Sequence, residues 1–274
     1  MKIITFFTLT VICLEQGFGQ CSKTEAIVEV NGINLYYEVC GEGEPLFLLH
    51  GWTQSSRFWS DYLPTFAEHF KVYSIDLRGH GKTSPLTTDF SIQKSAEDIL
   101  ELLNQLKIEK TNAIGLSFGG LVLLELANSY PEKIQTMILI GAASNYDGSK
   151  VSSEKTLSFK NLPKQYAEEL KKTHYHGEDQ INALFNPNLN YQISLTNEDL
   201  KAFKFSTLII NGDQDELLGI DPAFELHRNI PNSSLWIVPG TGHLAITGSN
   251  KKSFLINSLK FLKFGNEATD SVDK

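Results

Sequence analysis

The chain has 274 residues, 41% of them hydrophobic and 20% charged, which is enough for one large globular domain or two small ones. Its formal net charge is −8 and no lysine- and arginine-rich stripe occurs, which argues against a nucleic-acid partner. The three cysteines show neither a Cys-x-x-Cys pair nor a Cys/His spacing typical of a metal site. The sequence therefore predicts no cofactor and no bound metal.

The first twenty residues have the composition of a secretory signal. Lys2 precedes an apolar run at 3–14, and the small residues Gly17 and Gly19 follow it. The run is too short to anchor the chain stably across a bilayer, and a buried N-terminal helix or strand is the alternative. We expect an exported protein, secreted or periplasmic, with 1–20 removed as a signal peptide.

Removal of that segment leaves two cysteines, Cys21 and Cys40. In an oxidising compartment these two side chains could pair. Lipid attachment at Cys21 is the alternative, although Gln20 is an unusual residue to precede a lipidated cysteine. Both interpretations stay open at this point.

From Ala26 onward the chain starts with a hairpin and continues with alternating strands and helices. Asn31-Gly32 between two β-forming runs is the strongest short signal for a hairpin turn. The apolar run at 45–52 is typical of a strand buried on both faces of a sheet. The expected elements up to the middle of the chain are strands at 26–30, 33–39, 45–52 and 71–76, and helices at 56–70 and 91–106.

The stretch from Gly115 to Gly120 reads Gly-x-Ser-x-Gly and lies between an apolar strand and a helical run. A serine in this position would lie on a sharp strand-to-helix turn, which lifts its Oγ out of the sheet toward the N-terminal end of the helix. A plain glycine-rich turn is the alternative reading of the pentapeptide. The strand before it, the helix after it and suitable partners later in the chain favour Ser117 as a nucleophile.

Residues 144–203 interrupt the alternation. They are polar, form helices in places and contain no convincing strand. The alternation resumes with the run STLIINGDQD at 206–215 and a strand at 233–240, and the last helix ends at Gly265. The sequence thus predicts one α/β domain at 26–264, with a mostly parallel sheet between helices, an insertion at about 144–203 over the ligand-binding edge, and a disordered tail at 265–274.

A serine hydroxyl needs a base to accept its proton and an acid to orient that base. Of seven histidines, only His243 follows Ser117, leaves the C-terminal end of a strand and has an acid-bearing loop before it. The run STLIINGDQDE offers Asp213, Asp215 and Glu216, of which Asp215 is the expected acid and Asp213 the runner-up. Asp76 precedes the serine and is expected to be structural.

The tetrahedral intermediate also needs two N–H donors for its oxyanion, and we expect the backbone N–H groups of Phe118 and Trp52 to supply them. The side chains of Trp52, Phe118 and Leu244 are expected to give the site an apolar surface that suits an apolar acyl group; packing in the core is the alternative explanation. His174 and His176 could suggest a metal pair, but without a third ligand they are expected to be surface residues.

Together these motifs resemble the α/β-hydrolase superfamily over roughly 26–264. The matching pieces are His50-Gly51-Trp52, DLRGHG at 76–81, GLSFGG at 115–120, GDQD at 212–215 and GTGH at 240–243. The resemblance implies an eight-stranded sheet with a short helical cap inserted after the sixth strand. The serine at 117 separates the chain from haloalkane dehalogenases and epoxide hydrolases, which carry aspartate there. The likeness is to small esterases and cofactor-free perhydrolases, although Thr83 stands where that loop often has serine.

The leading hypothesis is a serine hydrolase that cleaves a small, apolar carboxylic ester through an acyl-enzyme intermediate. A thioester, lactone, amide or carbon–carbon bond as the substrate is an alternative within the same fold. A second alternative is a ligand-sensing protein that keeps the catalytic residues but turns over slowly.

Overall fold

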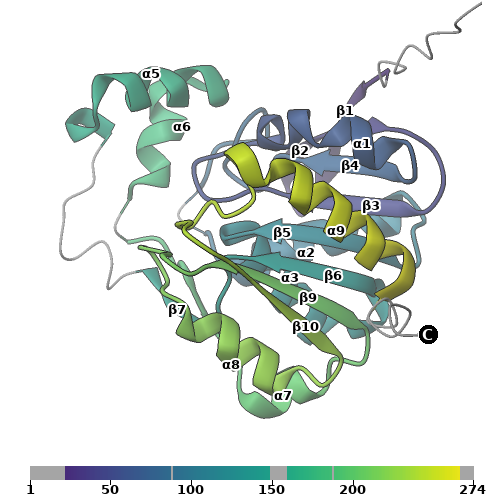
Figure 1. Ribbon diagram of the computed structural model, residues 1–274. Coiled ribbons are helices and arrows are strands. Elements are labelled where there is room, and N and C mark those ends of the chain that lie inside the picture. Colours follow the sequence, from purple (N-terminus) through teal and green to yellow (C-terminus); the bar gives the residue numbers. More distant parts are fainter. Residues whose placement is uncertain (1–21, 88, 149–158, 187, 266–274) are drawn as a thin grey trace, which may run out of the picture.

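The computed structural model describes residues 22–87, 89–148, 159–186 and 188–265 (Figure 1). The expected signal peptide and all but the first residue of the expected tail lie outside these ranges. Cys40 is disulfide-bonded, whereas the other two cysteines, Cys13 and Cys21, also lie outside the described residues.

An eight-stranded sheet forms the centre of the protein, with the strand order β1-β2-β4-β3-β5-β6-β9-β10. β2 pairs antiparallel with both β1 and β4, and all other neighbours are parallel. The fold class expected from the sequence is therefore confirmed. The strands are β1 (Thr24–Val30), β2 (Ile33–Cys40), β3 (Pro45–Leu49), β4 (Lys71–Ile75), β5 (Thr111–Leu116), β6 (Ile134–Ile140), β9 (Ser206–Gly212) and β10 (Ser233–Val238).

The first turn of the chain is the predicted hairpin. Asn31 and Gly32 both have positive φ, 45° and 77°, and join β1 to β2 with Val30 opposite Ile33. Asparagine and glycine adopt this left-handed conformation at low cost, and the resulting turn matches the twist of the strands.

Helices cover both faces of the sheet, because side chains along each buried strand point alternately to the two sides. Leu46 and Leu48 of β3 lie in the same apolar cluster as Phe254 of α9. The helices α1 (Leu63–Ala67) and α9 (Lys251–Phe264) pack on this face, and α9 crosses in front of the strands in Figure 1. The opposite face is covered by α2 (Ile92–Gln105), α3 (Phe118–Ser129) and α8 (Asp221–Asn229).

The insertion between β6 and β9 contains helices and one feature that the sequence analysis missed. β7 (Asn145–Asp147) and β8 (Gln192–Ser194) pair antiparallel, so the expectation of no strand at 144–203 is wrong. Three residues are too few to display the two-residue alternation that identifies a strand. Between these strands lie α5 (Lys164–Thr173) and α6 (Gly177–Leu184), which stand apart from the layered core in Figure 1; we call them the cap helices.

The remaining elements are short. They are the 3-10 helices η1 (Ser56–Asp61), η2 (Pro131–Lys133), η3 (Phe159–Asn161) and η4 (Gly248–Asn250), and the helix α7 (Asn197–Lys201). Within the described ranges, no helix combines the length and the apolar character needed to cross a membrane.

Candidate active site

Ser117 lies at the turn between β5 and α3 and has a strained backbone. Its φ is 49° and its ψ −113°, in a region that side-chain-bearing residues rarely adopt. The turn is fixed on both sides: the Ser117 N–H donates to Ile140 O at 2.7 Å and the Gly119 N–H to His50 O at 3.0 Å. The strain is therefore maintained by the two strands that flank β5.

Glycine is required on both sides of this serine. A Cβ at Gly119 would lie 2.4 Å from Leu49 O, and a Cβ at Gly115 would lie 2.5 Å from Gly119 O. Real Cβ atoms do not approach a carbonyl oxygen this closely, so any side chain would force the turn open. The Gly-x-Ser-x-Gly pattern thus follows from close backbone packing around Ser117.

His243 and Asp215 form a buried pair. The Nδ1 of His243 lies 2.9 Å from Asp215 Oδ2, and both side chains are almost inaccessible to solvent. The other oxygen of Asp215, Oδ1, accepts from the backbone N–H groups of Leu217 and Leu218. Burial raises the pKa of Asp215, but the hydrogen bonds from His243, Leu218 and Leu217 outweigh it and leave this pKa below its usual value.

The structure separates the two candidate acids clearly. Asp213 is exposed, and its Oδ1 accepts from the Thr241 N–H at 3.2 Å. It is Asp215 that reaches the ring of His243. The structure thus brings together the pair of residues that the sequence analysis ranked first.

Ser117 and His243 line the same cavity. The Nε2 of His243 is buried and has no hydrogen-bond partner among the described residues, and no hydrogen bond joins it to Ser117 in this conformation. Contacts of catalytic groups are often long in the absence of substrate and shorten when it binds. The free Nε2 is the atom that a general base would use.

The two backbone N–H groups expected as oxyanion donors belong to Trp52 and Phe118. The Phe118 N–H is the first of α3, and the Trp52 N–H follows β3; among the described residues neither has an acceptor. The side chain of Phe118, however, is fully buried against the rings of Trp52 and His80, and it does not line the cavity. For this ring the alternative, packing in the core, is correct, because the side chain at the helix start points into the core.

The cavity has a volume of about 730 Å³ and runs between the serine turn and the cap helices. Trp52 and Leu244 line it, as expected, and the cap supplies more apolar and aromatic side chains, namely Tyr146, Leu162, Tyr166, Leu170, Phe185 and Tyr191. Polar groups are fewer and include Arg57, Glu169 and Glu216. An apolar acyl or alkyl group of moderate size suits these walls.

A cluster of buried histidines lies behind the cavity. The rings of His50 and His80 are 5.1 Å apart, and those of His80 and His174 5.8 Å apart. The expectation that His174 is a surface residue is wrong: it is buried, whereas His176 is exposed. Burial lowers the pKa of His50 to about 3 and that of His174 to about 4, and it holds the pKa of His80 well below its usual value.

These histidines serve as neutral hydrogen-bonding groups. His50 Nε2 accepts from the Leu77 N–H at 3.0 Å, which places its hydrogen on Nδ1, 2.8 Å from Gly51 O. Among the described residues there is no group of three or more His, Cys, Asp or Glu side chains able to hold a metal ion.

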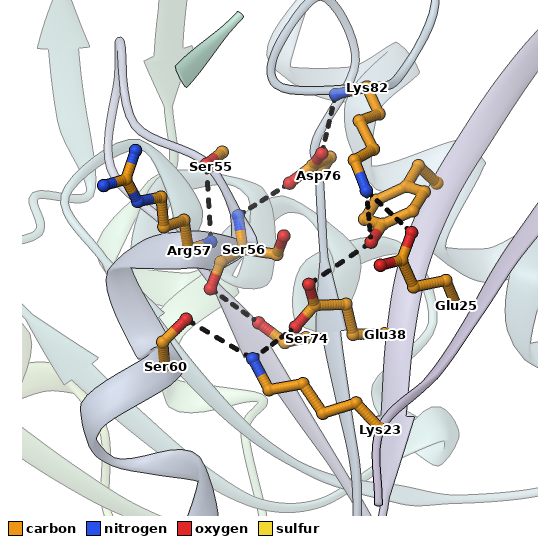
Figure 2. A network of polar contacts seen from close by, with 11 residues as sticks. Lys23, Glu25, Glu38, Ser55, Ser56, Arg57, Ser60, Ser74, Asp76 and Lys82 are labelled. Carbon is orange, nitrogen blue, oxygen red and sulfur yellow. Dashed lines mark hydrogen bonds and ion pairs between the residues drawn. The ribbon is translucent and has the colours of Figure 1, made fainter. Parts of the chain in front are cut away.

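Asp76 fixes the loops beside the site. Its carboxylate accepts from the Ser56 N–H at 2.6 Å and from the Lys82 N–H at 2.7 Å, as Figure 2 shows. The Lys82 ammonium continues this network to Glu25 and to the hydroxyl of Tyr36. Asp76 therefore has the structural role expected from the sequence.

Two further residues at the site have roles that the sequence analysis did not predict. Glu216 Oε2 accepts from the backbone N–H of His243 at 3.1 Å. Thr53, the residue after Trp52, has a φ of 63° and hydrogen bonds to the cap. The sequence GDQDE does not indicate that Glu216 binds the backbone of His243. No local pattern around Thr53 indicates a positive φ.

Comparisons with known proteins agree with this architecture. Residues 44–175 match the family model of the alpha/beta hydrolase fold. The serine hydrolase BPHL of Mus musculus is 28% identical over 255 residues, which cover 85% of this chain and 86% of that relative. The soluble epoxide hydrolase of Corynebacterium sp. (strain C12) is 35% identical over 111 residues, 40% of this chain and only 39% of that relative.

Among solved structures, the meta-cleavage product hydrolase of Pseudomonas fluorescens IP01 superposes with a TM-score of 0.74 at 21% identity. The match covers 87% of this chain and 97% of the other. At this identity the likeness concerns the fold. Sheet order, serine turn and family match lead to one conclusion: the chain belongs to the α/β-hydrolase superfamily.

Proposed function

We propose that this protein is a serine hydrolase that cleaves a small, apolar carboxylic ester through an acyl-enzyme intermediate. The observation that carries the proposal is the buried Asp215–His243 pair, whose free Nε2 borders the same cavity as Ser117. A serine raised on a strained turn, a histidine and a carboxylate are the groups needed for acyl transfer.

In the proposed reaction the Nε2 of His243 removes the proton of Ser117 Oγ as this oxygen attacks the ester carbonyl. The N–H groups of Trp52 and Phe118 stabilise the resulting oxyanion. His243 then gives its proton to the leaving alcohol, and a water molecule that it activates hydrolyses the acyl-enzyme. Asp215 keeps the hydrogen of the imidazole on Nδ1 and stabilises the imidazolium.

The walls of the cavity support an apolar substrate. Aromatic and aliphatic side chains predominate, and the charged groups Arg57, Glu169 and Glu216 are few. Arg57 and Glu169 lie 3.7 Å apart and partly neutralise one another. An ester with an uncharged acyl group thus fits better than a substrate with several charges.

The test is a panel of p-nitrophenyl esters of increasing acyl length, with thioesters and lactones beside them. Steady-state turnover on short and medium esters is the expected result. A single burst of p-nitrophenol without further turnover would instead indicate a ligand sensor. Activity confined to thioesters or lactones would replace the ester in the proposal and leave the serine mechanism in place.

We further propose that the protein is exported, secreted or periplasmic, with lipid attachment at Cys21 as the alternative to a disulfide between Cys21 and Cys40. The proposal depends on the apolar run at 3–14 and the small residues after it. These residues lie outside the described part of the chain.

A further inference from the structure

The loop that carries the Trp52 N–H contains a strained turn. Gly51 to Gln54 form a β-turn closed by the Gln54 N–H, which donates to Gly51 O at 3.1 Å. Thr53 occupies the third position of this turn with a φ of 63°. Glycine usually fills such a position, and a β-branched residue is disfavoured there. A conformation of this kind persists only where neighbouring groups hold it.

The groups that hold Thr53 come largely from the cap. The carbonyl oxygen of Thr53 accepts from His174 Nε2 at 3.1 Å. Its hydroxyl lies 2.8 Å from the hydroxyl of Tyr166 and 2.6 Å from Trp52 O. His174 follows the last residue of α5 and Tyr166 lies within that helix. The turn therefore depends on side chains about 120 residues away in the chain.

The chemical form of His174 is determined by its partners. Nδ1 lies 3.0 Å from the Gly81 N–H, which can only donate, so Nδ1 carries the lone pair. The hydrogen must then be on Nε2, from which it is donated to Thr53 O. The ring thus links the loop at 76–81 to the turn that holds the proposed oxyanion donor.

We infer that His174 is a positioning residue, which holds the Gly51–Gln54 turn so that the Trp52 N–H points to the oxyanion. The catalytic consequence depends on the function proposed above, but the effect on the turn does not. Without the hydrogen bond from Nε2, Thr53 can relax toward negative φ, and the turn that orients the Trp52 N–H changes shape.

Two amide substitutions separate the two hydrogen bonds of this ring. In His174→Asn the side-chain oxygen can replace Nδ1 and accept from Gly81, but nothing reaches Thr53 O. In His174→Gln the side-chain nitrogen can replace Nε2 and donate to Thr53 O, but the acceptor for Gly81 is lost. Each variant removes one hydrogen bond of the ring. If His174 only stabilised the fold, both variants would change exchange and kcat by the same amount. His176→Gln is the control, because His176 is exposed and its ring contacts Lys82 O at the surface.

Two measurements are needed on the full-length protein. The first is hydrogen–deuterium exchange of the peptide that contains residues 51–54. The second is the steady-state kinetics on a p-nitrophenyl ester. We expect His174→Asn to accelerate exchange and to lower kcat by about 10²-fold, as the loss of one oxyanion donor does, with little change in KM. His174→Gln and His176→Gln should remain near wild type in both.

Equal effects of the Asn and Gln variants, or unchanged exchange in His174→Asn, would overturn the inference. Should wild type turn over no ester at all, the proposed function fails, and the exchange data alone then decide whether His174 holds the turn.

Discussion

Glu216 accepts a hydrogen bond from the backbone N–H of His243 at 3.1 Å, while the adjacent Asp215 binds the ring of the same histidine. The two carboxylates thus hold His243 at its backbone and at its side chain. Because Glu216 is exposed, its contribution should be modest. We expect Glu216→Ala to lower kcat about 10-fold, in line with the loss of one hydrogen bond to a charged group. Glu216→Gln keeps an acceptor and should stay within about 3-fold of wild type; an Ala variant with full kcat would show that the histidine loop needs no such support.

The choice between the two aspartates can be tested directly. Asp215→Asn should lower kcat by about 10⁴, since the amide favours the wrong tautomer of His243. The loss should appear equally in kcat/KM, because the carboxylate acts on charge that develops in the transition state. Asp213→Asn should cost little, since Asp213 is exposed and accepts from the Thr241 N–H. Assays of both variants on one ester decide the matter, and an inactive Asp213→Asn beside an active Asp215→Asn would reverse the assignment.

The strained backbone of Ser117 makes separate predictions for stability and for activity. Ser117→Ala and Ser117→Gly should both abolish hydrolysis and labelling by a fluorophosphonate probe. Only glycine adopts a φ of 49° without strain, so Ser117→Gly should unfold with a free energy about 1 kcal/mol higher than Ser117→Ala. Urea titrations of the two variants provide the comparison. Labelling of another serine in either variant would contradict the assignment of the nucleophile.

The buried histidines predict how stability depends on pH. His174 has a folded-state pKa of about 4, lowered by burial from 6.5. As the pH falls below 6.5, His174 is protonated in the unfolded chain but stays neutral in the folded protein. The free energy of unfolding that this residue contributes above pH 6.5 is therefore lost as the pH falls toward 4. Between pH 6.5 and 5 the loss from this one residue is about 2 kcal/mol. His50, with a pKa of about 3, acts in the same direction.

The contribution of His174 can be isolated with His174→Gln, which does not titrate. Its free energy of unfolding should fall less than that of wild type between pH 7 and pH 5, by about 2 kcal/mol. Urea titrations at the two pH values measure the difference. His176→Gln serves as the control and should follow the wild-type curve. Parallel curves for His174→Gln and wild type would show that this histidine is protonated in the folded state.

The export proposal predicts the N-terminus of the mature protein. After expression in a host with a secretory pathway, intact-mass analysis should give a chain that begins at Gln20 or Cys21. Additional mass corresponding to a diacylglycerol would identify Cys21 as lipidated. A secreted or cellular product that retains Met1 would contradict export.

The sequence predicted the parts of the protein that depend on local chemistry. The hairpin at Asn31-Gly32 and the helix at 92–105 follow from turn propensity and from an apolar stripe, and both lie within a residue or two of their expected positions. The ranking of Asp215 above Asp213 followed from their distance to the strand end, and the structure places the ring of His243 beside the first. Each of these signals lies within a short stretch of chain.

The parts that could not be predicted depend on contacts between distant segments. His174 lies in a polar, helix-forming stretch whose composition suggests a surface, yet its ring is enclosed by loops at 53 and 81. The side chain of Phe118 follows the serine directly, but the direction of the helix start turns it into the core. The positive φ of Thr53 could not be predicted from the sequence, because β-branched residues such as threonine rarely adopt it.

The ends of the insertion lie side by side, with Asn145 paired to Ser194 and the Leu195 N–H bonded to Ser144 O. The polypeptide thus leaves the sheet and returns to it at nearly one point. Recombination could exchange the intervening residues, 146–193, for those of a relative and keep the sheet. A chimera without His174 would keep Ser117, but the Gly51–Gln54 turn that carries the Trp52 N–H would no longer be held in place. A new insertion that changes substrate specificity must therefore also supply a hydrogen-bond donor to Thr53 O in place of His174.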